Sequence, residues 1–232
     1  MKIIRNEKLI ARNEKISRYV NLAALVSLGI GIYIAFTRPE LLTWSLIAMF
    51  VGFVLTQVSI FLGNRYSRKP RPDEVLDAAL KGIPGEYTLY HYSTPVPHVL
   101  NGPAGIWVLV PYHQKGRVIF EKNRWRNFGG GFAQGYMRIF GQEGIGRPDL
   151  EAESQINALE KFFRKKLGEE AAGIPPINAA LVFLSPDIEI EAEGAPIPTL
   201  QAKKLKDHLR KHAKENPLPP ELQDRIQSAI LG

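Results

Sequence analysis

The sequence predicts a helical hairpin long enough to cross a membrane, followed by an α/β domain. Residues 20–36 and 41–63 are apolar runs without a charged side chain, and residues 37–40 separate them. At about 1.5 Å per residue the second run covers a hydrocarbon core of roughly 30 Å, and the first lies at the low end of the spanning range of about 17–25 residues. Pro39 marks a point where a helix stops and restarts. Behind the hairpin, helix-type and strand-type patterns alternate.

The two apolar runs have two other interpretations, a buried helical pair in a soluble protein and a cleaved signal peptide. Two uncharged runs of this length in succession are rare in soluble cores, which disfavours the buried pair. The signal peptide is disfavoured because residues 37–39 are a poor cleavage site and a second run follows at once. We therefore expect a membrane anchor over residues 1–72, with spans at about 20–36 and 41–63, and a separate domain over 73–232.

Charge is divided unevenly along the chain. The whole chain carries +7, but residues 1–72 hold 11 of the 30 basic and three of the 23 acidic residues, a net +8, which leaves −1 for residues 73–232. Six bases precede the first run and four follow the second, whereas the connecting loop has one. Because positive flanks stay in the cytoplasm, we expect a multi-pass protein of the cell membrane with both termini cytoplasmic. The lack of cysteine fits a reducing compartment.

Small side chains within the runs leave two interpretations open. Ser27, Gly29, Gly31 and Gly52 would let helices approach closely, in the hairpin or in a homo-oligomer formed through the spans. Ordinary span composition explains them as well. No Asp, Glu, Lys, Arg or His lies inside either run, so the runs show no transport path. Part of residues 1–19 is expected to form a helix on the membrane surface that continues into the first run.

The domain is expected to begin with a helix, followed by a strand meander and then by further helices and strands. Residues 106–110 are continuously apolar, which is typical of a strand buried on both faces, and residues 188–193 alternate Ile and Glu, which is typical of an edge strand. In chain order we expect a helix at 74–81, strands at 86–93, 96–100, 106–110 and 117–121, an amphipathic helix at 149–167, strands at 177–184 and 188–193, and helices at 200–214 and 219–231.

Glycines and histidines are the first candidates for site chemistry. The Gly-rich residues 129–146 lack the Gly-Lys-Ser/Thr ending of a phosphate-binding loop, so a surface excursion is expected. His91, His98 and His113 lie on or beside neighbouring strands and could gather around a transition metal. Their spacing is not that of a known closed metal site, so we expect separate core or edge histidines instead.

A local excess of basic residues is the other candidate, opposed only by Glu121 and accompanied by Trp107, Trp125 and Tyr136. Its members are Lys115, Arg117, Lys122, Arg124, Arg126 and Arg138. Such a set could bind phosphates of nucleic acid, with the aromatic rings stacking on bases. It could also face anionic lipid headgroups or solvent. A nucleic-acid site would require residues 115–138 to form one positive face.

The segment 96–110 resembles the nuclease-related domain (NERD) family, through His98, the run Gly102-Pro103-x-Gly105 and the apolar strand that follows. The resemblance extends over about 73–213. Its weaker parts are Glu74 in the first helix, the turn Lys115-Gly116, Gln155 in the middle helix and the strand at 182–183. It implies a restriction-endonuclease-like mixed sheet flanked by helices, which agrees with the element order expected above.

The chain departs from the family pattern at the positions that carry catalysis. Family nucleases are expected to hold a divalent metal with a strand Asp and the Glu of Glu-x-Lys, and to use the Lys of that motif near the attacked phosphate. In this chain the Asp position is Pro97, the Glu position is Val110 and the Lys position is Tyr112. Pro97 and Val110 offer no side-chain oxygen to a hard cation, and a phenol carries no positive charge. Glu74 is the one acid that remains, and one carboxylate does not make a metal-assisted hydrolytic site. We therefore predict no catalytic residue, no metal and no cofactor.

The leading hypothesis is a membrane-anchored, non-catalytic NERD-like protein that serves as a binding or scaffolding module. Its expected partners are the lipid bilayer and anionic headgroups. One alternative is a nucleic-acid-binding protein or residual metal-dependent nuclease. Another is a subunit of a membrane assembly that acts through its helical hairpin and forms homo-oligomers through the Gly-bearing faces.

Overall fold

The computed structural model describes residues 1–128 and 145–231 and divides them into two compact units. One unit is the segment Asn6–Arg71, which contains the hairpin; the other combines Met1–Arg5 with the chain from Pro72 onward. The predicted division at residue 72 therefore differs from the structure at the N-terminus. The first five residues belong to the α/β domain, although the hairpin follows them in sequence.

The hairpin unit consists of two antiparallel helices, as predicted. Helix α1 (Glu7–Thr37) begins after Asn6, whose side chain accepts a hydrogen bond from the Leu9 amide at 3.0 Å. A short 3-10 turn, η1 (Pro39–Leu41), leads into α2 (Leu42–Leu62), and a π-helical turn, η2 (Gly63–Ser67), extends it. Both helices are long and apolar enough to cross a membrane.

Two glycines bring the hairpin helices into backbone contact. A Cβ atom on Gly31 would lie 3.0 Å from the Ser45 carbonyl oxygen, and one on Gly52 would lie 3.0 Å from the Leu28 amide nitrogen. The Ser45 hydroxyl donates a hydrogen bond of 2.6 Å to the Gly31 carbonyl across this contact. Gly29, in contrast, has nothing within 4 Å of its Cβ position. Close helix approach is thus confirmed inside the hairpin for Gly31 and Gly52, but not for Gly29.

The domain is built on a mixed sheet of six strands in the order β1-β2-β3-β4-β7-β9. The strands are β1 (Lys2–Arg5), β2 (Thr88–His91), β3 (His98–Gly102), β4 (Gly105–Tyr112), β7 (Ile177–Phe183) and β9 (Thr199–Gln201). The meander β2-β3-β4 is antiparallel, and β1, β7 and β9 add parallel pairs on its two sides. The predicted mixed sheet flanked by helices is confirmed at this level.

Within residues 1–19, of which only part was expected to be helical, the first residues form strand β1. Residues Lys2–Arg5 pair in parallel with Thr88–His91, and only from Glu7 onward does the chain form a helix that continues into the first apolar run. Ile4 packs against the core while Ile3 stays exposed, the alternation of a strand at a sheet edge. A four-residue strand with a distant partner leaves no local signal in the sequence.

A second, three-stranded sheet forms beside the first in the order β6-β5-β8. Its strands are β5 (Arg117–Glu121), β6 (Arg124–Phe128) and β8 (Glu189–Glu191). The strand predicted at residues 117–121 is β5, and it pairs with β6 and β8 in this second sheet rather than with the main meander. The prediction of an edge strand within residues 188–193 is confirmed by β8.

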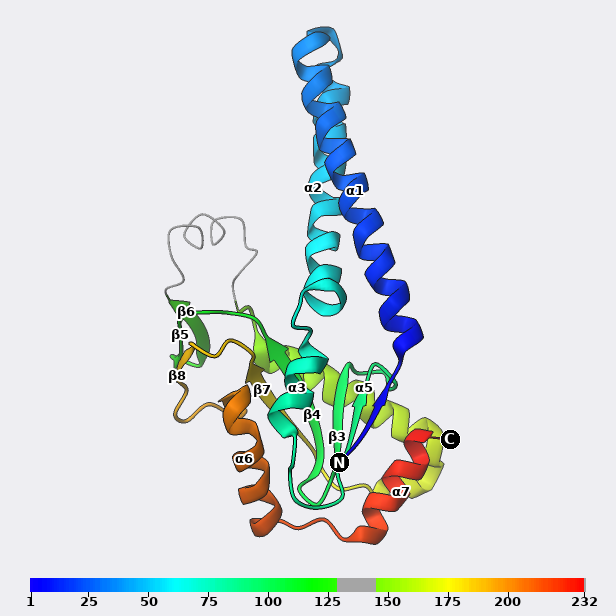
Figure 1. Ribbon diagram of the computed structural model, residues 1–232, viewed down its shortest axis with the longest axis vertical. Helices are drawn as coiled ribbons and strands as arrows, with labels where there is room; N and C mark the ends of the chain where they lie inside the picture. Colours follow the sequence, from blue (N-terminus) through cyan, green and yellow to red (C-terminus); the bar gives the residue numbers. More distant parts are fainter. Residues whose placement is uncertain (129–144, 232) are drawn as a thin grey trace. The chain divides into compact units, whose positions relative to one another are not determined.

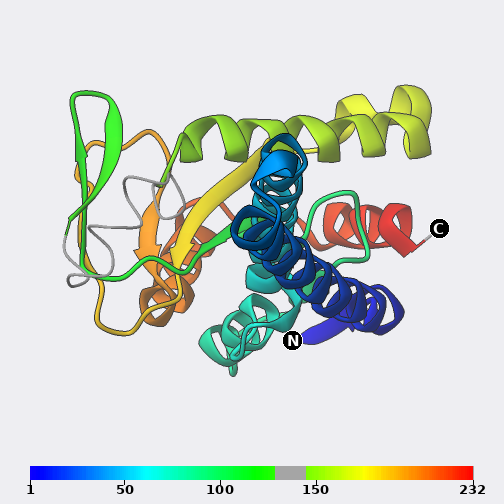
Figure 2. The ribbon, with the colours of Figure 1, turned by 90° about the horizontal axis from the view of Figure 1, so that it is seen from above.

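Helices cover both faces of the main sheet (Figures 1 and 2). On one face, α5 (Pro148–Leu167) and α7 (Pro220–Leu231) share a core with the side chains of Val108 and Val110. On the other, α3 (Pro72–Leu80) and α6 (Ala202–Glu215) share a core with Trp107 and Leu109. Strand β4 is thus buried on both sides, as its continuous apolar sequence predicts.

Candidate functional site

The positions that the NERD resemblance assigns to catalysis do not meet in one place. Val110 and Tyr112 point from β4 into the core under α5. Glu74 lies in the first turn of α3, whose Leu76 and Leu80 pack on the opposite face of the sheet. Pro97 precedes β3, and its carbonyl accepts a hydrogen bond of 2.8 Å from the Tyr92 amide. The sheet therefore stands between α3 and the two β4 side chains.

Tyr112 is a buried, neutral phenol. Its ring stacks on Phe183 with centroids 5.4 Å apart, and its hydroxyl donates a hydrogen bond of 2.7 Å to Glu151 Oε2. Burial, and then the negative charge of Glu151, raise the pKa of Tyr112 far above its ordinary value of 10.0. The side chain is accordingly a structural donor between β4 and α5, and it cannot supply the positive charge that a lysine would supply there.

A buried polar cluster lies on the α3 face of the sheet, and we call its five residues the Arg5 cluster. Arg5 Nε lies 2.9 Å from Asp73 Oδ2, and the same guanidinium also pairs with Asp77. The other oxygen of Asp77 lies 3.0 Å from Nε2 of His91, whose Nδ1 lies 2.8 Å from Nδ1 of His98. The side chains of Asp73 and His91 are fully buried. Each buried charge thus has a partner of opposite sign.

The two histidines of the Arg5 cluster are joined by a hydrogen bond between their rings. A short contact between two ring nitrogens requires one to donate and the other to accept. When His91 Nε2–H donates to Asp77 and His91 is neutral, its Nδ1 accepts from His98. Tyr92, which packs its ring against His98 at 5.0 Å, has a left-handed backbone with φ of 56°. This arrangement fixes the orientation of the two imidazole rings.

The structure brings together two of the three histidines that the sequence singled out. His91 and His98 touch, whereas His113 follows β4 and lies outside the cluster. In the part of the chain that is described, no group of three or more His, Asp or Glu side chains is placed to hold a metal ion. The contact between His91 and His98 is therefore a core hydrogen bond that joins β2 to β3.

The basic set of the sequence analysis is interleaved with acids. Arg117 makes two hydrogen bonds to Glu191, of 2.8 and 2.6 Å, and Arg124 lies opposite Glu121 in the strand register. The strand β8 adds a second carboxylate, Glu189, directly beside Arg117. Lys115, Lys122 and Arg126 are exposed, and Arg138 lies outside the described residues. Over residues 115–128, then, the second sheet presents both signs of charge.

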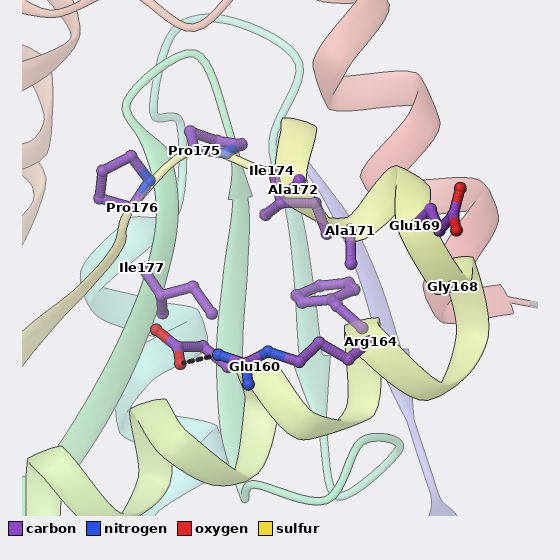
Figure 3. A pocket seen from close by; sticks show the side chains of 11 residues that line it. Glu160, Arg164, Gly168, Glu169, Ala171, Ala172, Ile174, Pro175, Pro176 and Ile177 are labelled. Atoms are coloured by element: carbon purple, nitrogen blue, oxygen red, sulfur yellow. Dashed lines mark ion pairs between the residues drawn. The ribbon is translucent and has the colours of Figure 1, made fainter.

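A pocket of about 650 Å³ opens between the end of α5 and the start of β7, next to the turn η3 (Gly168–Gly173). Its walls are mainly apolar, and Figure 3 shows Pro175, Pro176 and Ile177 facing the ion pair of Glu160 with Arg164. The nitrogen and oxygen of that pair lie 3.5 Å apart on an exposed helix turn. The side chains that line this pocket include no Ser, Thr, Lys or His.

No protein-family model, no curated protein and no solved structure matches this chain. Sequence reasoning missed Arg5, Asp73 and Asp77. The four-residue spacing that places Asp73 and Asp77 on one face of α3 was the available signal. The long-range partner Arg5 had no signal at all.

Proposed function

We propose that this chain is a two-span protein of the cell membrane whose α/β domain is a cytoplasmic, non-catalytic binding module with a restriction-endonuclease-like, NERD-related fold. The observation that carries the proposal is the outer surface of the hairpin. Phe36, Tyr33 and Phe50 are 85%, 68% and 67% exposed, and most of the other large exposed apolar side chains lie on the same two helices. Soluble proteins rarely expose a continuous apolar surface of this size, whereas lipid solvates it.

The position of β1 supports an even number of crossings. Strand β1 precedes the hairpin and pairs with β2, which follows it, so both ends of the hairpin enter one folded unit. A polypeptide that leaves and re-enters the same folded domain must end on the side of the membrane from which it started. Together with the basic flanks, this arrangement supports cytoplasmic termini and an external loop around Pro39.

The occupants of the family positions support a non-catalytic domain. The Val110 side chain has no atom that could bind a metal, and the Tyr112 hydroxyl donates a hydrogen bond to Glu151 within the core. A metal-assisted nuclease needs several oxygens that converge on one ion, with an open position for the attacked phosphate. Glu74 lies in a helix that packs on the opposite face of the sheet from Val110 and Tyr112. We therefore propose that the domain binds a partner without hydrolysing it.

Topology can be tested by cysteine labelling, because the natural chain contains no cysteine. We expect Glu40→Cys to react with a membrane-impermeant maleimide on intact cells, and the matched variant Lys69→Cys to react only after the membrane is permeabilised. The protein should also stay in the membrane fraction after alkaline extraction. Labelling of both sites on intact cells, or release of the chain by alkali, would contradict the proposal.

Catalysis can be tested with the purified full chain in neutral detergent. With Mg²⁺ or Mn²⁺ we expect no cleavage of single- or double-stranded DNA or RNA above that of a Glu74→Ala variant. Cleavage that depends on Glu74 would show a working nuclease. Tight DNA binding that weakens steeply with salt would instead favour the nucleic-acid alternative.

A further inference from the structure

We propose that the hairpin carries a binding pocket for the phosphate group of an anionic membrane phospholipid. The pocket lies within the hairpin unit, between α1 and the end of α2 with its π-helical turn, and has a volume of about 570 Å³. Six of its lining residues carry the argument: Ser17, Arg18, Asn21, Ser59, Ser67 and Arg68. This inference rests on the proposed membrane insertion and names the lipid chemistry that the anchor would recognise.

The floor of the pocket is polar, although it lies where the two apolar runs of the hairpin begin and end. Ser17 and Ser59 are only 5% and 4% exposed, and the Asn21 amide donates a hydrogen bond of 3.1 Å to the Ser59 hydroxyl. The Ser67 hydroxyl oxygen is buried and has no hydrogen-bond partner within the described part of the chain. A buried hydroxyl without a partner is costly, and a ligand oxygen beside it would remove that cost.

The rim of the pocket is cationic. Arg18 comes from α1 and Arg68 follows the π-helical turn, and no carboxylate is among the residues that line the pocket. Arg18 contacts Glu14 at 2.5 Å, but a guanidinium has five N–H donors, so others remain for a ligand. Arg68 makes one long contact of 3.4 Å to Asn64. Two guanidinium groups that flank one pocket match the oxygens of a phosphate.

The π-helical turn explains why the second cation reaches the pocket. The Arg68 amide donates to the Gly63 carbonyl at 2.8 Å, a five-residue step that inserts one extra residue into the helix. One residue corresponds to a rotation of about 100° around the helix axis. Without the extra residue, Ser67 and Arg68 would be rotated by about this angle away from the pocket that they now line. Such turns occur often at functional sites.

The depth of the pocket along the hairpin favours a lipid over a soluble phosphate. Arg18 is two residues before the first apolar run, and Gly63, which also lines the pocket, ends the second run. In a hairpin that spans the bilayer, this level coincides with the headgroups, where bases are attracted to anionic lipid. Arg65 and Lys69, which follow α2, offset the negative end of its dipole.

The test compares two double variants that lose the same charge. In Arg18→Gln/Arg68→Gln both pocket cations are lost, and in Lys15→Gln/Lys69→Gln one base is lost from each flank outside the pocket. The full chain, purified in neutral detergent, is titrated with phosphatidylglycerol or phosphatidylcholine, and retained lipid is measured by native mass spectrometry. We expect one phosphatidylglycerol per natural chain, a weakening of at least about tenfold for the pocket variant, and a much smaller change for the control.

A third variant, Ser67→Leu, fills the pocket without a change in charge and should also weaken retention. Equal losses in the two double variants would show diffuse surface attraction and overturn the proposal. So would retention of phosphatidylcholine as well as phosphatidylglycerol, or displacement of the lipid by millimolar inorganic phosphate, which would indicate a soluble ligand. A natural chain that resists alkaline extraction but shows no preference for phosphatidylglycerol refutes this pocket alone. A chain that alkali releases refutes the proposed membrane insertion itself.

Discussion

The hairpin and the α/β domain bury opposite kinds of atoms. Between the hairpin helices lie hydroxyls and small residues such as Ser17, Ser45, Gly52 and Ser59, while large apolar side chains point outward. In the domain, Leu, Val and aromatic side chains fill both cores and most charges lie outside. Water drives apolar groups inward, whereas helices in lipid gain from backbone contact and interhelical hydrogen bonds. The two units are thus built for different solvents.

The Arg5 cluster is the exception in the domain, because it buries charged side chains. The largest effect of a substitution is expected there. Arg5→Met should leave the fully buried Asp73 without its cation and cost about 3–5 kcal/mol of unfolding free energy. Lys2→Met, in the same strand but exposed, is the matched control and should change little. Urea unfolding of the full chain in detergent, followed by tryptophan fluorescence, measures both. Similar losses in the two variants would show that β1 matters for its strand pairing alone.

The stability of the hairpin should depend on side-chain size at the helix contact, whereas that of the domain depends on charge in the Arg5 cluster. Gly52→Val places a side chain within 3.0 Å of the Leu28 backbone nitrogen and should cost about 1–3 kcal/mol by overpacking. Gly29→Val, on the open side of the same helix pair, is the control and should be nearly neutral. Thermal unfolding in detergent by circular dichroism distinguishes them. A larger loss of stability in Gly29→Val would show that the outer face of the hairpin makes the more important helix contact. A homo-oligomer formed through the spans would require such a contact.

The smallest expected effect concerns pH and belongs to the domain. His208 on α6 is half-buried against Trp107, with ring centroids 5.5 Å apart, and burial lowers its pKa, assisted by the charges of His212 and Lys211. Because the folded pKa is below the unfolded value of 6.5, the stability associated with the neutral ring is fully present above pH 6.5 and is lost as the pH falls through the folded pKa.

We therefore expect the unfolding midpoint in urea to decrease as the pH is lowered from neutrality, and the decrease to be shallower in His208→Gln. Lys204→Gln, an exposed change on the same helix, should keep the natural pH profile. A variant His208→Gln with an unchanged profile would assign the pH dependence to other groups of the domain.

Local pattern predicted much of the secondary structure. The continuous apolar run at 106–110 became the doubly buried strand β4, and the helices expected at 149–167, 200–214 and 219–231 are α5, α6 and α7. These elements were predictable because burial imposes a period on the sequence. The candidate site was less predictable. The basic residues were correctly identified as a group, but the acids of β8 that interleave with them are more than 60 positions away in sequence.

By itself the sequence determined the two apolar helices and the order of most helices and strands in the domain, since length, hydropathy and period are local properties. Only the tertiary structure decided that Met1–Arg5 joins the domain, that Arg5 meets Asp73 and Asp77, and that β5 leaves the main sheet. Each of these depends on pairs of residues far apart in the chain. Such contacts are chosen by the free energy of the whole fold, because no local pattern distinguishes one distant partner from another.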